Sequence, residues 1–274
     1  MFSLNIETSI FIYHDCVRVK TPILWRHFLR DLYSMKTVII VAISLISYFC
    51  NAQTDGYAEA LRLNQDKQYL KSAAVCTSNL EKLAAGDTLI IKFLELSGED
   101  YIALNEFATA ANDFKKLITL KPGIAGYVNL SYCYGEIGDY DNCIDILKKA
   151  LLIDNKDISI YNNLSYYSAR QNNYADAISF ANQGLMYVAD QLWKGTLLNN
   201  RGYGYIGLKQ YDKALNDINE SIKLNDDNSF AYCYRALANI GLKKMETVCD
   251  DLNKAKDMGA QNLTADLIRD YCRK

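Results

Sequence analysis

Histidine and proline are scarce in this chain of 274 residues, and the scarcity of histidine narrows its chemistry. The chain has two histidines, His14 and His27, and both precede residue 53. A Ser–His–Asp or Cys–His catalytic arrangement needs a histidine, as does a His-ligated zinc or iron site. Residues 53–274 can build none of these, so we expect neither an enzyme nor a protein with a metal or another cofactor.

Two further absences concern cysteine spacing and positive charge. No two of the eight cysteines stand in a C-x-x-C spacing, which argues against a zinc knuckle or a thioredoxin-like site. No stripe of Lys and Arg occurs, and residues 53–274 hold 25 basic against 29 acidic side chains. Because phosphate contacts dominate nucleic-acid affinity, we do not expect nucleic acid as a partner. Hydrophobic residues make up 50% of the chain, which is enough for a substantial core.

An apolar segment with the sequence MKTVIIVAISLISYFCNAQ, Met35–Gln53, has the features of a secretion signal. Lys36 precedes fourteen largely apolar residues, 37–50, whereas a membrane-spanning helix needs about 20. Cys50 and Ala52 supply the small residues of a cut before Gln53. We therefore predict a signal peptide at 35–52 and interpret residues 1–34 as an extension upstream of the true start. An uncleaved membrane anchor and a lipidated Cys50 remain as alternatives.

A short sequence motif that begins with an aromatic residue or Met recurs along residues 53–274. Its first positions are Tyr69, Phe107, Tyr140, Tyr174, Tyr211 and Met245, separated by 38, 33, 34, 37 and 34 residues. A period of about 34 residues is typical of stacked structural units. We therefore expect a repeat protein.

Each unit carries the pattern of a helical pair. A small residue follows the aromatic position by three, and an apolar residue comes four later, as in Ala110 and Phe114, Cys143 and Leu147, Ala177 and Ala181, and Ala214 and Ile218. These spacings place the side chains on one stripe of a helix. Turn formers such as Gly138–Asp139 interrupt the pattern, and Asp- and Asn-rich loops at 153–157 and 224–228 close the units. Each unit is thus predicted to be a helix–turn–helix pair.

The pattern resembles the tetratricopeptide repeat family. Residues 97–122 match it best, with Gly98, Tyr101, Ala110, Phe114 and Pro122, and residues 199–226 also resemble it. The resemblance implies an all-α fold, a right-handed α-solenoid of stacked helix–turn–helix repeats. It divides the chain into a degenerate first repeat at 53–90, five repeats at 91–260 and a capping helix at 261–274, since the last repeat of a solenoid needs a polar-backed cap.

The resemblance also implies where a partner would bind. In this family the first helices line a concave surface, on which the ninth position corresponds to Tyr132, Tyr166 and Tyr203, and the fifth to Asn162 and Asn199. Tyr combines contact area with a hydroxyl, which suits a bound peptide. Packing of the tyrosines against one another is the alternative. Asn129, Asn163 and Asn200 recur at the sixth position, and we expect them to bond between helices.

Cysteine pairing is expected if the chain is exported, because disulfides persist under oxidising conditions. In antiparallel helices the end of the capping helix lies beside the start of the preceding helix, which brings Cys272 toward Cys249. The second candidate pair is Cys133 and Cys143, across one helical pair. The alternative is that these thiols are buried and free.

Together these features lead us to expect an exported, non-enzymatic scaffold of the bacterial periplasm or cell envelope. It would bind a protein or peptide of unknown identity on its concave surface, and it would meet a membrane only through an uncleaved leader. The alternative is a structural subunit of an envelope complex that assembles through its outer surface.

Overall fold

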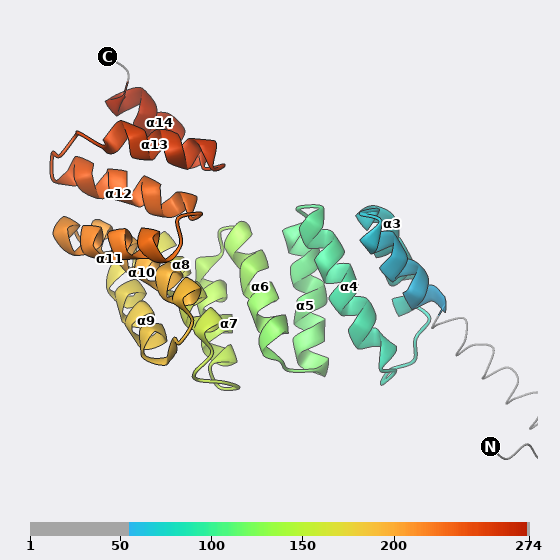
Figure 1. Cartoon of the computed structure of the whole chain (residues 1–274). Coiled ribbons are helices and arrows are strands. Elements are labelled where there is room, and N and C mark those ends of the chain that lie inside the picture. Colours follow the sequence, from blue (N-terminus) through green and yellow to red (C-terminus); the bar gives the residue numbers. More distant parts are fainter. Residues whose placement is uncertain (1–54, 273–274) are drawn as a thin grey trace, which may run out of the picture. The chain divides into compact units, whose positions relative to one another are not determined.

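The computed structural model describes residues 55–272. The chain divides into two compact units, Met1–Ala58 and Glu59–Lys274, and only the second is described at length below. The predicted signal peptide, its alternatives and the upstream extension all lie outside the described residues. Residues 59–65 are helical and precede the first helix of Figure 1 that carries a label.

Helices are the regular elements of the described residues, and they follow one another in pairs. Their bounds are α3 Tyr69–Leu80, α4 Leu89–Ala103, α5 Phe107–Leu120, α6 Ile124–Glu136, α7 Tyr140–Ala150, α8 Ile158–Arg170, α9 Tyr174–Tyr187, α10 Gln191–Gly207, α11 Tyr211–Leu224, α12 Ser229–Gly241, α13 Val248–Asp257 and α14 Gln261–Tyr271. Each helix packs against the next one along the chain, and α10 also packs against α8 and α12 (Figure 1). The predicted all-α solenoid is confirmed.

The turn inside each pair has one geometry throughout the array. A residue with a positive φ stands two positions before each recurring aromatic or Met residue; these residues are Lys67, Asn105, Gly138, Asn172, Lys209 and Lys243. A residue in the left-handed backbone conformation ends the first helix and turns the chain toward the second helix. Gly138 adopts this conformation without a steric cost and asparagine tolerates it, so packing must hold the turns at Lys67, Lys209 and Lys243 in place.

The stripe predicted for the second helices is buried. Ala110, Cys143, Ala177 and Ala214 are each 0% exposed, and the apolar residues four positions later are at most 1% exposed. Close packing of this kind is the main favourable term in a helical array, because each buried aliphatic side chain contributes about 1.5–3 kcal/mol. The recurring pattern is therefore the core of the repeats.

The aromatic residue that opens each second helix packs against the first helix of the following repeat. A Cβ built on Gly207 would lie 2.3 Å from the ring of Tyr174, and one built on Gly241 would lie 2.4 Å from the ring of Tyr211. Phe107 makes the equivalent contact with Tyr132 of α6, with ring centroids 5.9 Å apart. The residues that define the repeat thus join successive repeats.

Helix α10 is longer than its counterparts. It has 17 residues, whereas α6 and α8 have 13 each. Asp190 caps its first turn by accepting a hydrogen bond from the backbone N–H of Trp193 at 3.0 Å. Trp193 is 38% exposed, so packing covers only part of its surface.

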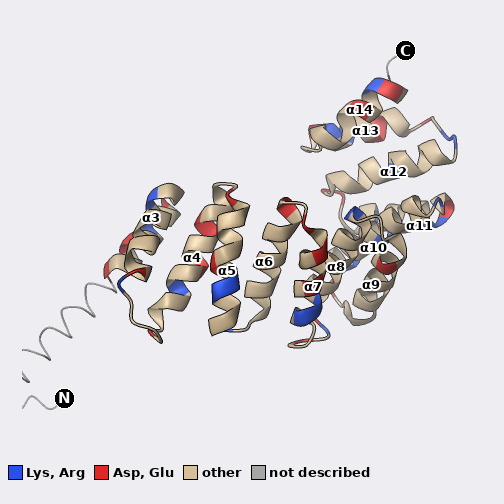
Figure 2. Ribbon diagram, turned by 180° about the vertical axis from the view of Figure 1, so that it is seen from behind, with Lys and Arg blue, Asp and Glu red and all other residues tan. Residues whose placement is uncertain are grey.

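Within residues 55–272, no helix has the length and apolar character that crossing a membrane requires. Charges of both signs are spread along the helices in the view of Figure 2.

Candidate functional site: a tyrosine-lined surface

The three predicted tyrosines occupy equivalent places on successive first helices, Tyr132 on α6, Tyr166 on α8 and Tyr203 on α10. The ring of Tyr203 stacks on that of Tyr234 from α12, with centroids 4.5 Å apart and planes 9° from parallel. The hydroxyl of Tyr166 is close enough to both Tyr132 and Tyr203 to raise their pKa values electrostatically. These four residues are called the tyrosine row below.

Exposure changes along the tyrosine row. Tyr132 is 38% exposed, Tyr166 and Tyr203 are half-buried, and Tyr234 is 6% exposed. Burial is the main cause that raises the pKa of each of the four hydroxyls, so all four remain neutral near pH 7. Of the three predicted tyrosines, Tyr166 and Tyr203 pack against neighbouring rings, whereas Tyr132 offers a more open surface.

A cation stands beside the row. Arg170, at the C-terminal end of α8, donates from Nε and Nη2 to the hydroxyl of Tyr140 at 3.3 and 3.2 Å. Its guanidinium carbon lies 5.9 Å from the centre of the same ring. Among the described residues, none of the ion pairs within 4.0 Å includes Arg170. Its side chain is exposed, so a cation without a carboxylate partner lies next to tyrosine rings.

The acidic neighbour of the row is Glu136. Its charge contributes to the raised pKa values of Tyr132 and Tyr166, which places its carboxylate near both. Glu136 stands one repeat before Arg170, at the same place in its repeat. The row is thus flanked by one negative and one positive side chain.

The two predicted asparagines have other surroundings. Asn162 accepts a hydrogen bond from Nδ2 of Asn200 at 2.8 Å, so it is engaged between α8 and α10. Asn199 is 4% exposed, and its Oδ1 has no hydrogen-bond partner among the described residues. Its expected place on the open surface is therefore wrong, because α10 is packed between neighbouring helices and this residue faces them. The interhelical bond expected at the sixth position is present for Asn200.

Comparisons with known proteins identify the kind of repeat that builds this fold. A family model described as a tetratricopeptide repeat matches residues 124–157 and 196–228, which are the repeats that hold Tyr132 and Tyr203. The chain therefore contains tetratricopeptide repeats. A curated relative, RNA polymerase II-associated protein 3 of Xenopus tropicalis, is 31% identical over 137 residues. That match covers 50% of this tetratricopeptide repeat protein and only 19% of the relative.

Solved structures agree with the fold. A tetratricopeptide repeat protein from Parabacteroides merdae superimposes with a TM-score of 0.62 at 17% identity, over 80% of this chain and 83% of that one. The C-terminal part of a repeat protein from Cytophaga hutchinsonii gives a TM-score of 0.55 at 17% identity, over 75% and 80%. MamA from Desulfovibrio magneticus gives 0.53 at 14% identity, over 64% and 97%. At these identities the likeness concerns the fold alone.

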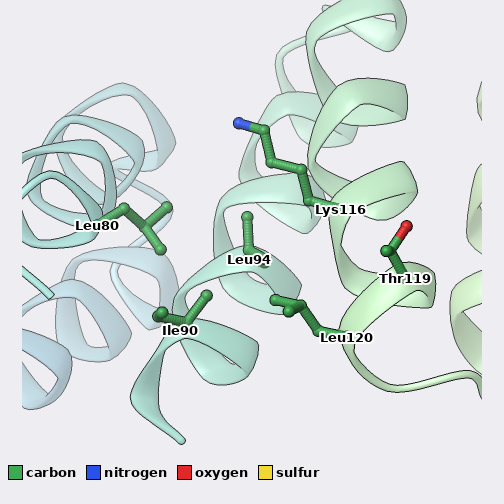
Figure 3. Close-up of a pocket in the computed structure, with 6 residues that line it drawn as sticks. All are labelled: Leu80, Ile90, Leu94, Lys116, Thr119 and Leu120. Atoms are coloured by element: carbon green, nitrogen blue, oxygen red, sulfur yellow. The ribbon is translucent and has the colours of Figure 1, made fainter. Parts of the chain in front are cut away.

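A shallow cavity lies elsewhere in this tetratricopeptide repeat protein, between the degenerate first repeat and the next one. It has a volume of about 400 Å³ and is lined by Leu80, Ile90, Leu94, Lys116, Thr119 and Leu120 (Figure 3). Leu120 is 53% exposed at its edge. The lining offers one ammonium and one hydroxyl group, which form no nucleophile–base pair. Among the described residues, no cluster of His, Cys, Asp or Glu could hold a metal ion.

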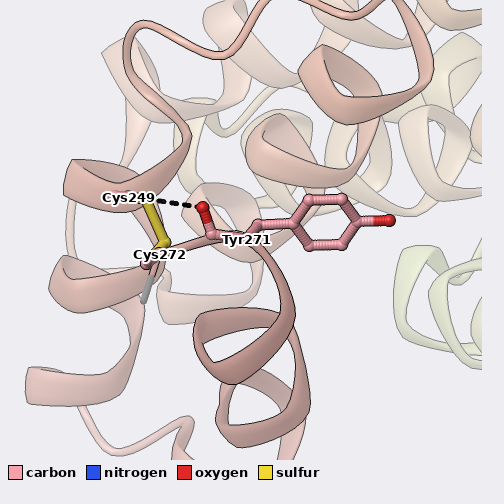
Figure 4. The surroundings of a disulfide bond; sticks show 3 residues. All are labelled: Cys249, Tyr271 and Cys272. Carbon is pink, nitrogen blue, oxygen red and sulfur yellow. Dashed lines mark hydrogen bonds between the residues drawn. A yellow bond between two sulfur atoms is a disulfide. The ribbon is translucent and has the colours of Figure 1, made fainter. Parts of the chain in front are cut away.

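Cys249 on α13 and Cys272 after α14 form a disulfide (Figure 4). Their Cα atoms lie 5.6 Å apart, and Sγ of Cys249 lies 3.6 Å from the backbone oxygen of Tyr271. This is the pair named first from the sequence. The second candidate pair is wrong: Cys133 and Cys143 are free thiols with 0% exposure. They fill the core of their repeat, where burial raises their pKa values to about 11 and about 12.

Two members of the site were missed from the sequence. Arg170 follows Tyr166 by four residues and so lies on the same helix face, a spacing that could have identified it. Tyr234 stands at a different repeat position from Tyr203, and no spacing rule would have paired them.

Proposed function

We propose that this tetratricopeptide repeat protein is an exported, non-enzymatic scaffold that binds a protein partner along the tyrosine row. The repeat fold supports a role in protein interaction, and the exposed Arg170 beside the row carries the more specific proposal. A cation held against tyrosine rings and left without a carboxylate partner is suited to bind one from another chain.

The tyrosine row suits an extended peptide segment. Tyr166 and Tyr203 are already held by neighbouring rings, so little side-chain freedom is lost when a partner covers them. Tyr132 adds an open ring at one end of the row. The preferred segment would carry an acidic side chain toward Arg170 and a basic one toward Glu136, because opposite charges across an interface favour one orientation.

A co-purification experiment tests this proposal. A tagged chain would be isolated with its bound partner, and the partner would be identified by mass spectrometry. The Arg170→Glu variant should lose at least about 90% of the partner, since reversing a charge at the centre of an interface costs several kcal/mol. Lys148→Glu on α7 is the matched control, because Lys148 is also exposed and lies away from the row. Full retention of the partner by Arg170→Glu would refute the proposal.

Export is tested separately. If the leader is cleaved before Gln53, the N-terminus of the protein recovered from the periplasmic fraction begins at or near this residue. Recovery from the cytoplasmic fraction with an intact N-terminus would contradict export and leave the binding proposal standing.

A further inference from the structure

Six large apolar side chains are exposed at two junctions between successive repeats, the one from α7 to α8 and the one from α9 to α10. Leu152 and Ile153 lie in the loop after α7, Met186 and Tyr187 end α9, and Leu192 and Trp193 begin α10. Their exposed fractions, in that order, are 86%, 48%, 76%, 40%, 55% and 38%. They are called the 152–193 patch below. Large apolar groups that gather on a surface mark an interaction site more often than scattered ones do.

Tyr161 of α8 shows that the two loops are neighbours. Its hydroxyl donates a hydrogen bond to the backbone oxygen of Asn155, in the loop after α7, at 2.8 Å. Its ring stacks on that of Tyr187, with centroids 6.0 Å apart. Tyr161 is 5% exposed, so it is a buried residue that contacts both loops. Figure 1 shows the loops after α7 and after α9 at the same lower edge of the array.

The charges around the 152–193 patch are balanced. Lys148, Lys149, Lys156 and Lys194 stand near it, and so do Asp145, Asp154, Asp157 and Asp190. Three of the four carboxylates accept backbone hydrogen bonds within the loops or at the start of helices, at Lys156, Ser159 and Trp193. A surface that binds an anionic membrane carries an excess of Lys and Arg, which this one lacks. An apolar centre with a rim of both signs can instead pair with itself across a two-fold axis.

We propose that the 152–193 patch binds the same patch of a second copy of this chain. Six side chains of this size, each exposed over roughly half of its surface, present on the order of 700 Å². That is close to the roughly 800 Å² per partner of a stable interface. In such a pair the rim of each copy offers charges of both signs to the other, Lys156 among the basic and Asp190 among the acidic side chains.

The test measures the mass of the protein in solution. Residues 53–274 with the disulfide intact would be followed by sedimentation velocity and light scattering over the micromolar range. The wild-type chain should form a dimer, and Leu152→Glu with Met186→Glu should raise its dissociation constant at least about 100-fold, because two charges would be buried without partners. Both side chains are largely exposed in the single copy, so the helical content and melting temperature should stay unchanged.

The matched control is Leu70→Glu. Leu70 is 67% exposed at the start of α3, far along the sequence from the patch, and this variant should dimerise like the wild type. Three results would overturn the proposal: a monomeric wild type, a dimer that survives the double substitution, or a dimer that Leu70→Glu weakens equally. A monomer that binds vesicles of phosphatidylcholine and phosphatidylglycerol, with binding lost in the double variant, would also overturn it and assign the patch to lipid.

Discussion

Among single residues, Asp100 of α4 has the most unusual surroundings. Asp100 is 0% exposed, and its Oδ1 accepts a hydrogen bond from Nδ2 of Asn64 at 2.8 Å. Oδ2 is buried without a partner among the described residues. Burial is the main cause that raises the pKa of Asp100 above its ordinary value of 3.8. The nearby thiol of Cys76 stays neutral, because burial and then the charge of Asp100 raise its pKa to about 12.

This carboxyl makes the stability depend on pH in a defined direction. Because its pKa is higher in the folded than in the unfolded chain, the folded state holds the proton more tightly. The resulting stability is complete below pH 3.8 and is lost as the pH rises through the raised pKa. Asp100→Asn, which keeps an acceptor for Asn64 and removes the charge, should therefore increase the free energy of unfolding at pH 7 by about 1 kcal/mol. Denaturant titrations at pH 4 and pH 7 measure this gain.

The gain from Asp100→Asn should be small at pH 4 and should grow toward pH 7. Asp66→Asn is the control, because Asp66 is half exposed and its pair with Arg62 at 3.7 Å is a surface pair worth little. A gain of equal size at both pH values would show that the charge of Asp100 is not the cause.

At the scale of residues, the sequence predicted the core better than the surface. Ala110 and Leu147 belong to a periodic stripe, and a period is visible in the chain itself. Asn199 is buried in α10, which packs against α8 and α12, so its burial depends on neighbours that are distant in sequence. The isolation of Arg170 from carboxylates is equally a property of the folded chain.

At the scale of helices, three repeats hold a polar pair whose members stand 16 residues apart. Ser97 donates to Asp113 at 2.8 Å, Arg201 contacts Asp217 through two bonds of 2.6 and 2.7 Å, and Arg235 contacts Asp251 through bonds of 2.8 and 2.6 Å. Two further repeats have apolar residues at the same places, Leu130 with Ile146 and Leu164 with Phe180. Each of the five repeats from α4 to α13 therefore uses either a polar or an apolar pair.

The arginines of these pairs also reach the preceding repeat. Nη1 of Arg201 donates to Oδ1 of Asn182 on α9 at 2.7 Å, and Nη1 of Arg235 donates to Asn219 on α11 at 3.4 Å. A guanidinium can serve three acceptors in this way because its donors are fixed in a plane. The polar pairs thus help to set the register between successive repeats.

This alternation predicts the outcome of exchanging one kind of pair for the other. Arg201→Leu alone should lower the free energy of unfolding by about 2–4 kcal/mol, because Asp217 is only 11% exposed and loses its partner. The double variant Arg201→Leu with Asp217→Ile reproduces the pair of Leu130 and Ile146, and should return to within about 1 kcal/mol of the wild type. Chemical denaturation of the three proteins gives the coupling energy.

The control for the exchange is Lys223→Leu, because the pair of Lys223 with Glu220 is exposed and should contribute less than about 1 kcal/mol. Additive losses in the Arg201 and Asp217 double variant would mean that the arginine acts through Asn182 and not through the carboxylate.

The turns show where prediction at the helix scale reaches its limit. Gly138 and Asn172 are recognised turn formers, and both have a positive φ as their residue types favour. Lys67, Lys209 and Lys243 adopt the same conformation although nothing in their type favours it. The repeat as a whole imposes their geometry, so a single residue could not reveal it.

At the scale of the whole array, the C-terminal end differs from the rest because a covalent bond closes it. The disulfide joins α13 to the end of α14 and encloses a separation of 23 residues. Leu267 and Ile268 of α14 pack on the buried Val248 and Leu252 of α13. In repeat proteins each unit contacts only its neighbours, so the stability gained here stays near this end.

Removal of the disulfide should therefore act locally. Cys249→Ser with Cys272→Ser should lower the stability of the last repeat by about 3 kcal/mol, as expected for a loop of this length. Hydrogen exchange should show faster exchange of the amides in α13 and α14, and unchanged rates in α4 to α7. The free cysteines Cys76, Cys133, Cys143 and Cys233 are buried, so the same change should follow from a mild reductant. A uniform loss of protection along the chain would contradict this prediction.

The C-terminal end of the array has a disulfide and the N-terminal end of the described repeats has none, so the repeats should unfold in one direction. The helices of the first repeat meet α4 at a buried carboxyl that lacks one partner, whereas α14 is fastened by a bond that thermal motion does not break. Stress on the array, from a protease or from a pull on a bound partner, would open the repeats in order from residue 59 onward. The tyrosine row lies beyond the first two repeats and would be among the later parts to be lost.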